Sequence, residues 1–153
     1  MTVREASSAD LAGLAEIERA CFSEPWSENA LAGTLGNPLA RLFCAAEEDG
    51  TLSGYAGVYL LDEDADITNV AVLPAFRRQG IADAVLVSLE AFCREHGAQL
   101  LHLEVRASNT PALALYEKHG FVRDGLRKNY YKNPKEDAVL MTLPLTSPNK
   151  GTV

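Results

Sequence analysis

Ala75-Phe-Arg-Arg-Gln-Gly-Ile-Ala82 is the stretch of this chain that decides its fold. It places an Arg-x-x-Gly-x-Ala pattern between an apolar segment, 66–73, and an amphipathic segment that begins near Gly80. Apolar residues of the second segment recur at three- and four-residue spacing, as on one buried face of a helix. They are Ile81, Ala82, Val85, Leu86, Leu89, Phe92 and Cys93. We therefore predict a strand, a glycine turn and a helix in that order.

The turn is suited to an anion because it leads into a helix N-terminus. The first backbone N–H groups of a helix have no partner within it, and the helix dipole adds partial positive charge there. Gly80 permits close approach of the backbone to a ligand, and Arg77 and Arg78 add charge. The patterns of two common nucleotide loops, Gly-Lys-Ser/Thr and Gly-x-Gly-x-x-Gly, are absent from the sequence. On the motif alone, an ordinary turn is an equal alternative.

Length and composition predict one globular domain, because 153 residues with 47% apolar and 23% charged side chains can bury a sizeable core. The sequence has neither an apolar run of about 18 residues nor a secretion signal, so we expect a cytoplasmic protein without a membrane partner. A formal net charge of −7 argues against a nucleic-acid partner and is compatible with cationic acceptors such as amines.

The three cysteines, Cys21, Cys44 and Cys93, are far apart and lack the spacing of metal ligands. We expect reduced, structural thiols and no metal site.

The hydrophobic pattern predicts about seven strands and four helices. The expected strands cover 2–6, 41–47, 52–61, 65–73, 100–105, 121–131 and 138–143. The expected helices run from Ser8 to about Cys21, from Ser27 to Leu35, from near Gly80, and from Asn109 to His119. Ser8, Ser27 and Asn109 are the expected N-caps of three of them. This order predicts an α/β fold with a mixed, mostly antiparallel sheet, whose parallel pair is formed by 65–73 and 100–105. We assign a single domain to 1–145 and expect a disordered tail over 146–153.

A carboxylate interrupts the apolar strand over 100–105. Leu101, Leu103 and Val105 should share one face, which leaves His102, Glu104 and Arg106 on the other. A carboxylate is costly to bury unpaired, so we expect that Arg106 or His102 neutralises Glu104, or that Glu104 faces a cleft. A strand-face salt bridge therefore competes with a catalytic role.

The next helix carries a candidate acid. Asn109 and Tyr116 are seven residues apart, about two helical turns, and so project from the same side. Tyr116 is either a core aromatic residue or a phenolic acid. A carboxylate base and a phenolic acid beside a phosphate-binding loop would suit acyl transfer to an amine.

Three further aromatic residues are candidates for an acceptor pocket. Trp26 lies in a polar loop, where it is either a packing anchor or a pocket wall. Tyr130 and Tyr131 are adjacent on a strand, so we expect at most one of them to line any single pocket.

These motifs together resemble the GNAT acetyltransferases. The matching segments are Pro25-Trp-Ser27, Asn69-Val-Ala-Val72, Arg77 to Ala82, Leu103-Glu-Val-Arg-Ala-Ser-Asn109, Ala114-Leu-Tyr-Glu117, Gly120-Phe121, and Arg127-x-Asn-Tyr-Tyr131 with Glu136-Asp-Ala138. Within that family they are most similar to the bacterial enzymes that acetylate the N-terminal alanine of a small-subunit ribosomal protein. The resemblance covers about residues 1 to 145.

The resemblance implies acetyl-CoA as acetyl donor. Its pyrophosphate would rest beside Arg77 on the N–H groups of Arg78, Gln79, Gly80, Ile81, Ala82 and Asp83; its pantetheine would run beside Val70, Ala71 and Val72, where the parallel strands would splay apart; and Asn109 would contact CoA. Glu104 would be the general base, acting through water, and Tyr116 the general acid, in direct transfer within a ternary complex. A ribosomal-protein N-terminus is the expected acceptor. Lysine side chains, other N-termini and small amines are alternatives, as is a non-catalytic acetyl-CoA-binding module.

Overall fold

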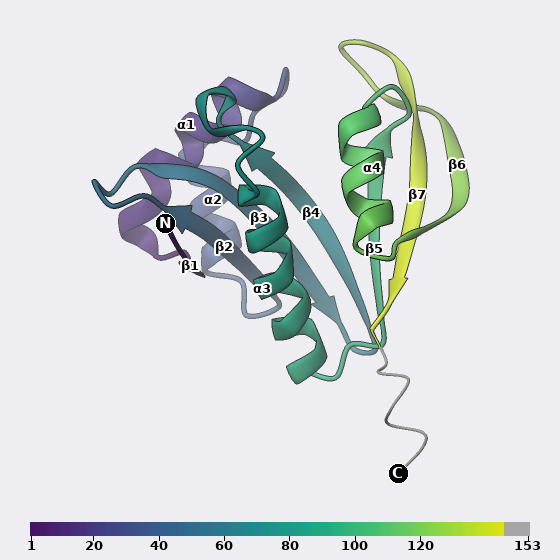
Figure 1. Ribbon diagram of the computed structural model, residues 1–153, viewed down its shortest axis with the longest axis horizontal. Coiled ribbons are helices and arrows are strands. Elements are labelled where there is room, and N and C mark those ends of the chain that lie inside the picture. Colours follow the sequence, from purple (N-terminus) through teal and green to yellow (C-terminus); the bar gives the residue numbers. More distant parts are fainter. Residues whose placement is uncertain (146–153) are drawn as a thin grey trace. The chain divides into compact units, whose positions relative to one another are not determined.

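The computed structural model describes residues 1–145 (Figure 1). The tail predicted for 146–153 lies outside the described residues. Two compact units make up the described chain. The first unit comprises Met1–Tyr59 and Thr68–Phe92, and the second comprises Leu60–Ile67 and the described residues from Cys93 onward.

The elements of the first unit are two helical segments, a hairpin and a strand-loop-helix. They are β1 (Thr2–Glu5), the short 3-10 helix η1 (Ser8–Asp10), α1 (Leu11–Cys21), α2 (Glu28–Leu35), β2 (Ala40–Ala46), most of β3 (Leu52–Leu61), the second half of β4 (Asp64–Val72), η2 (Pro74–Phe76) and most of α3 (Ile81–Glu95). The second unit holds the first half of β4 and the elements β5 (Leu100–Arg106), α4 (Thr110–Lys118), β6 (Val122–Tyr131) and β7 (Glu136–Pro144).

Hydrogen bonds join the seven strands in the order β1-β2-β3-β4-β5-β7-β6. The pairs β1/β2, β2/β3, β5/β7 and β6/β7 are antiparallel. β4 and β5 are parallel, and their ladder joins Asp64–Asp66 to Leu100–His102 within the second unit. The predicted mixed sheet with this parallel pair is confirmed.

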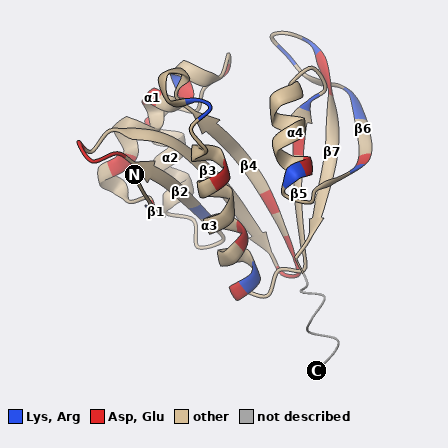
Figure 2. Cartoon of the chain, viewed as in Figure 1, with Lys and Arg blue, Asp and Glu red and all other residues tan. Residues whose placement is uncertain are grey.

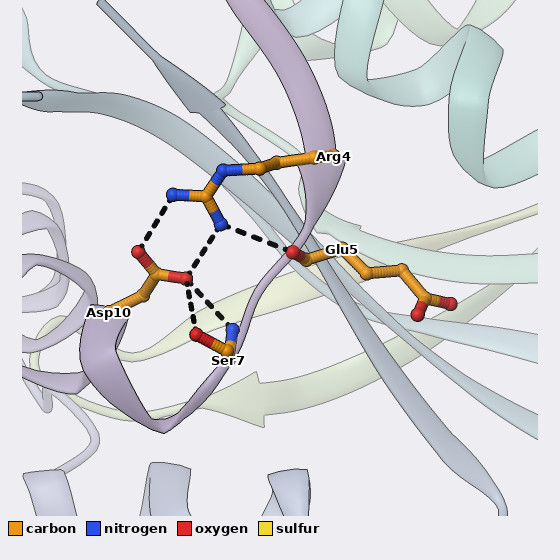
Figure 3. Close-up of polar contacts among 4 residues, drawn as sticks. All are labelled: Arg4, Glu5, Ser7 and Asp10. Carbon is orange, nitrogen blue, oxygen red and sulfur yellow. Dashed lines mark hydrogen bonds and ion pairs between the residues drawn. The ribbon is translucent and has the colours of Figure 1, made fainter.

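The entry into α1 differs from the prediction, which made Ser8 its cap. Residues Ser8–Asp10 form a 3-10 turn, and Ser7 precedes it with its backbone N–H donating to Asp10 Oδ2 at 2.8 Å. Arg4 donates to both oxygens of the same carboxylate, at 2.8 and 3.0 Å (Figure 3). This guanidinium lowers the pKa of Asp10 and ties β1 to the start of α1.

Buried apolar side chains occur in both units. Among the most buried side chains of the first unit are Leu14, Ile17, Leu31, Leu42 and Tyr55. In the second unit, Leu101, Leu103 and Val105 are buried while the alternate residues of β5 are not, which confirms the predicted faces of this strand. The predicted cap of α2 is also confirmed, since Ser27 Oγ accepts from Ala30 N at 3.1 Å.

All three cysteines are free thiols; Cys44 and Cys93 are buried and Cys21 is half-buried. Burial raises the pKa of the Cys44 thiol, which keeps it protonated. Over residues 1–145, no helix is both long and apolar enough to cross a membrane. Among these described residues, there is no group of three or more His, Cys, Asp or Glu side chains that could hold a metal ion.

Candidate active site

The loop before α3 has the backbone of an anion site. Arg78 and Gly80 both have positive φ, of 65° and 78°, and such residues turn successive N–H groups towards one side. The first hydrogen bond of α3 runs from Ala84 N to Gly80 O at 3.1 Å, so the amides of Ile81 and Ala82 precede the helical ladder. The predicted start of this helix is confirmed, and basic residues mark the turn (Figure 2).

Gly80 is required by conformation and not by packing. A Cβ at this position would meet no heavy atom of the described chain within 4 Å. Its positive φ lies in the left-handed region that favours glycine. The backbone at Gly80 is therefore open on this side, as close approach of an anion would require.

Arg77 has a role that the sequence did not reveal. Its Nε donates to Val72 O at 3.1 Å and its Nη2 lies 3.7 Å from Cys21 Sγ. The Cys21 thiol in turn donates to Val72 O at 3.3 Å. The Arg77 guanidinium therefore fastens the loop to the end of β4 and to α1. Arg77 and Arg78 are both exposed.

The strand segment Val70–Val72 is held at a close approach to β3. A Cβ at Gly54 would lie 2.9 Å from Ile81 Cγ2 and 3.0 Å from Ala71 O. Gly54 therefore lets β3, β4 and the start of α3 pack together. A glycine within a strand is a weak signal of such an approach, and sequence reasoning missed it.

Glu18 on α1 forms a buried polar network that was also missed. Its side chain is 1% exposed and accepts hydrogen bonds from Trp26 N at 2.8 Å, from Asn69 Nδ2 at 3.1 Å and from the Tyr55 hydroxyl. Burial and Glu18 together raise the pKa of Tyr55. The available signal was a glutamate on the helix face that also carries Leu14 and Ile17.

In the second unit, Glu104 is paired differently from the prediction. Its Oε2 lies 3.9 Å from Arg127 Nη1 of β6, and it accepts a hydrogen bond from Tyr130 that raises the pKa of that phenol. The first alternative, that Arg106 or His102 neutralises Glu104, is wrong; the second, that Glu104 faces a cleft, stays a prediction. Glu104 is 35% exposed, so water reaches it.

The two residues expected to neutralise Glu104 have other partners. Arg106 lies 3.3 Å from Glu136 and donates to Pro134 O and Lys132 O at 2.8 and 3.0 Å. His102 contacts Thr142 Oγ1 at 2.9 Å and Asp64 Oδ1 at 3.3 Å. Both side chains are satisfied by the strands and the turn that flank β5.

Tyr130 and Tyr131 lie together, whereas strand alternation predicted that they face opposite sides. Their ring centroids are 5.0 Å apart, edge to face. Burial and then Glu104 raise the pKa of Tyr131 to about 12. The β6/β7 register shifts between Arg127 and Tyr131, and Asn129 has a φ of 54°, so strict alternation fails here.

Tyr116 and Asn109 lie on α4 as predicted. Asn109 is the N-cap, with Oδ1 accepting from Ala112 N at 3.2 Å. Tyr116 is 7% exposed and packs edge to face on Phe121, with ring centroids 5.7 Å apart. Burial raises the pKa of Tyr116, so the phenol keeps its proton at neutral pH.

Comparison with known proteins defines the class. The chain matches the acetyltransferase (GNAT) family over residues 11–121. It is 34% identical over 147 residues to the ribosomal protein bS18-alanine N-acetyltransferase of Escherichia coli, covering 95% of this chain and 98% of that protein. It is 40% identical over 139 residues to the Haemophilus ducreyi enzyme of the same name, covering 89% and 94%.

Solved structures agree. The crystal structure of the ribosomal-protein-S18-alanine N-acetyltransferase from Escherichia coli superposes with a TM-score of 0.87 at 34% identity, covering 95% of this chain and 94% of that one. This chain belongs to the GNAT acetyltransferase family.

Proposed function

We propose that this protein transfers the acetyl group of acetyl-CoA to a protein N-terminal α-amine, and that the N-terminal alanine of ribosomal protein bS18 is its main acceptor. The supporting observation is 34% identity, over 95% of this chain, to an enzyme with that activity. Such an acceptor would place the protein in the cytoplasm. Residues 1–145 would act as one acetyltransferase domain, since the family match includes parts of both units.

Donor contacts belong to the first unit. The residues that would hold acetyl-CoA there are Val70, Ala71, Val72, Arg77, Arg78, Gln79, Gly80, Ile81, Ala82 and Asp83. Asn109 is proposed as a further CoA contact on the family resemblance alone. Amides at the start of α3 would bind the pyrophosphate, and the exposed Arg78 would add charge. Arg77 would hold the loop in shape through Val72 O.

Glu104 would be the general base. Arg127 and Tyr130 contact its carboxylate from β6 and restrict its orientation, while its partial exposure admits the water that would relay a proton. An α-amine has a pKa of about 8, against about 10.4 for a lysine side chain, so a carboxylate has less work to do on an N-terminus. This difference favours α-amines over lysine as acceptors.

Tyr116 would be the general acid. Its raised pKa keeps the hydroxyl protonated at the pH of the reaction, so that it can protonate the departing thiolate. Tyr130 and Tyr131, whose phenols are influenced by Glu104, would contact the acceptor. Trp26 is a further candidate for acceptor contact.

Two matched peptides test the proposal. Both begin with the alanine-initiated sequence of bS18 and contain lysine, and one has its α-amine blocked. With acetyl-CoA and the protein, mass spectrometry should show an acetyl group on the free peptide alone. Modification of both peptides would indicate a lysine acetyltransferase, and modification of neither would favour another acceptor or a binding module.

A further inference from the structure

The last turns of α1 contact two loops. One is the loop over residues 73–80 that precedes α3, called the donor loop below, and the other is the loop that carries Trp26. Cys21 contacts Val72 O and Arg77, at the start of the donor loop. One turn earlier, Glu18 contacts Trp26 and Asn69. All of these residues belong to the first unit, so the contacts lie inside one compact body.

The Glu18 carboxylate acts only as an acceptor in this network. Three donors point at it: the Tyr55 hydroxyl, the Trp26 backbone N–H and the Asn69 amide. Trp26 is half-buried and packs against the core of this unit, so it is held both by its backbone hydrogen bond to Glu18 and by the packing of its ring. A single carboxylate thereby fixes the loop relative to β3 and β4.

The network carries a cost that stability alone does not explain. Because Asn69 turns its Nδ2 towards Glu18, its Oδ1 is buried and accepts no hydrogen bond from any residue in 1–145. Buried carbonyls without a partner are rare in native structures. Replacing buried charged groups by apolar groups of similar volume often leaves the stability of a fold unchanged or raises it. Natural proteins break the rules of polar pairing mainly at functional sites, so a buried unpaired atom points to a role in function.

We propose that Glu18 is a positioning residue for the acceptor. It holds the backbone of Trp26, and hence the wall of the pocket that receives the N-terminal residue. This inference rests on the proposed function, because it assigns Trp26 to the acceptor side. Glu18 itself touches neither substrate in this account.

Two buried variants separate positioning from stability. Glu18→Gln keeps the size of the side chain but weakens the acceptance from Trp26, and Tyr55→Phe removes a different hydrogen bond to the same carboxylate. We expect Glu18→Gln to raise the KM for an alanine-initiated peptide several-fold, up to about tenfold, because a neutral acceptor replaces the charged one. Tyr55→Phe should change that KM less than about twofold, and kcat and acetyl-CoA affinity should be similar in both variants.

Trp26 supplies a readout that is independent of the acceptor, because it is the single tryptophan of the chain. Its fluorescence should become more accessible to acrylamide in Glu18→Gln but not in Tyr55→Phe. If no N-terminal peptide is acetylated by the parent protein, the proposed function fails while this fluorescence comparison still tests the loop. Unchanged quenching in Glu18→Gln would overturn the inference.

Folding of the variants is checked by circular dichroism. Should Glu18→Gln not fold, Glu18→Met combined with Asn69→Val replaces the charge and its amide partner by apolar groups of similar size. A raised acceptor KM in that protein supports the proposal. Equal effects of Glu18→Gln and Tyr55→Phe on acceptor KM, or an equal loss of acetyl-CoA affinity in Glu18→Gln, would contradict it.

Discussion

Arg127 Nη1 on β6 lies 3.9 Å from Glu104 Oε2 on β5. β7 separates these two strands in the sheet, so the pair reaches across a strand. Arg127 also stacks on Tyr130, its guanidinium carbon 5.5 Å from the ring centroid. The β6 strand thus brings a cation and a phenol to the proposed base.

Glu104→Gln should reduce kcat by about 100-fold or more, the usual contribution of a general base. The neutral amide has nearly the same shape and cannot accept a proton at neutral pH. Acetyl-CoA affinity, measured by calorimetry, should stay within about twofold, since the donor contacts lie elsewhere. Glu117→Gln is the matched control, because Glu117 pairs with Arg123 on the surface. A parallel loss of acetyl-CoA binding in Glu104→Gln would mean that Glu104 serves the donor site.

Tyr116→Phe should lower kcat by about 100-fold while preserving the fold. Phenylalanine keeps the edge-to-face contact with Phe121 and loses only the hydroxyl. Stopped-flow measurement of CoA release checks the effect on kcat, and thermal unfolding checks that the fold is preserved. Full activity with an unchanged melting temperature would assign Tyr116 to the core alone.

Gly80→Val should weaken acetyl-CoA binding at least tenfold, because a β-branched residue is strained at a φ of 78° and would distort the amides of the loop. Gly33→Ala is a suitable control: Gly33 lies inside α2, a Cβ there meets nothing within 4 Å, and the change should add about 0.5–1 kcal/mol of stability. Calorimetric titration of both variants with acetyl-CoA measures the two affinities. An unaltered affinity in Gly80→Val would remove the assignment of this loop.

Asp10→Asn should make the stability of the protein less sensitive to acid. Arg4 lowers the pKa of Asp10 in the folded state, so the stabilisation is complete above the unfolded pKa of about 4 and is lost as the pH falls through the folded-state value. Urea unfolding at pH 7 should show a loss of about 1–2 kcal/mol in the variant. The difference from the parent should shrink towards pH 2, and a constant difference at both pH values would exclude this linkage.

Local patterns predicted the elements well. The alternation of Leu101, Leu103 and Val105, and the caps at Ser27 and Asn109, depend on neighbours a few residues away, and the structure has them as expected. The start of α1 was misplaced, because a 3-10 turn over Ser8–Asp10, capped by Ser7, precedes the helix and α1 begins only at Leu11. Ser7 and not Ser8 is the cap because its backbone N–H donates to the Asp10 carboxylate, which Arg4 holds in place.

Long-range pairings could not be read from spacing. The partners of Glu104 depend on how β6 bulges before Tyr131, which also brings Tyr130 and Tyr131 together. The Glu18 network joins α1, the following loop, β3 and β4. The residue pattern of any one of these segments cannot predict contacts between them. The roles of these residues in catalysis stay predictions.

Transfer to the intact acceptor protein is the most direct test of the central claim. Unacetylated ribosomal protein bS18 is incubated with acetyl-CoA and either the parent protein or Glu104→Gln, and fragmentation mass spectrometry locates the acetyl group. We predict one acetyl group, on the N-terminal alanine, that forms with the parent and at least about 100-fold more slowly with the variant. Acetylation of lysine side chains, or equal rates with both proteins, would contradict the account.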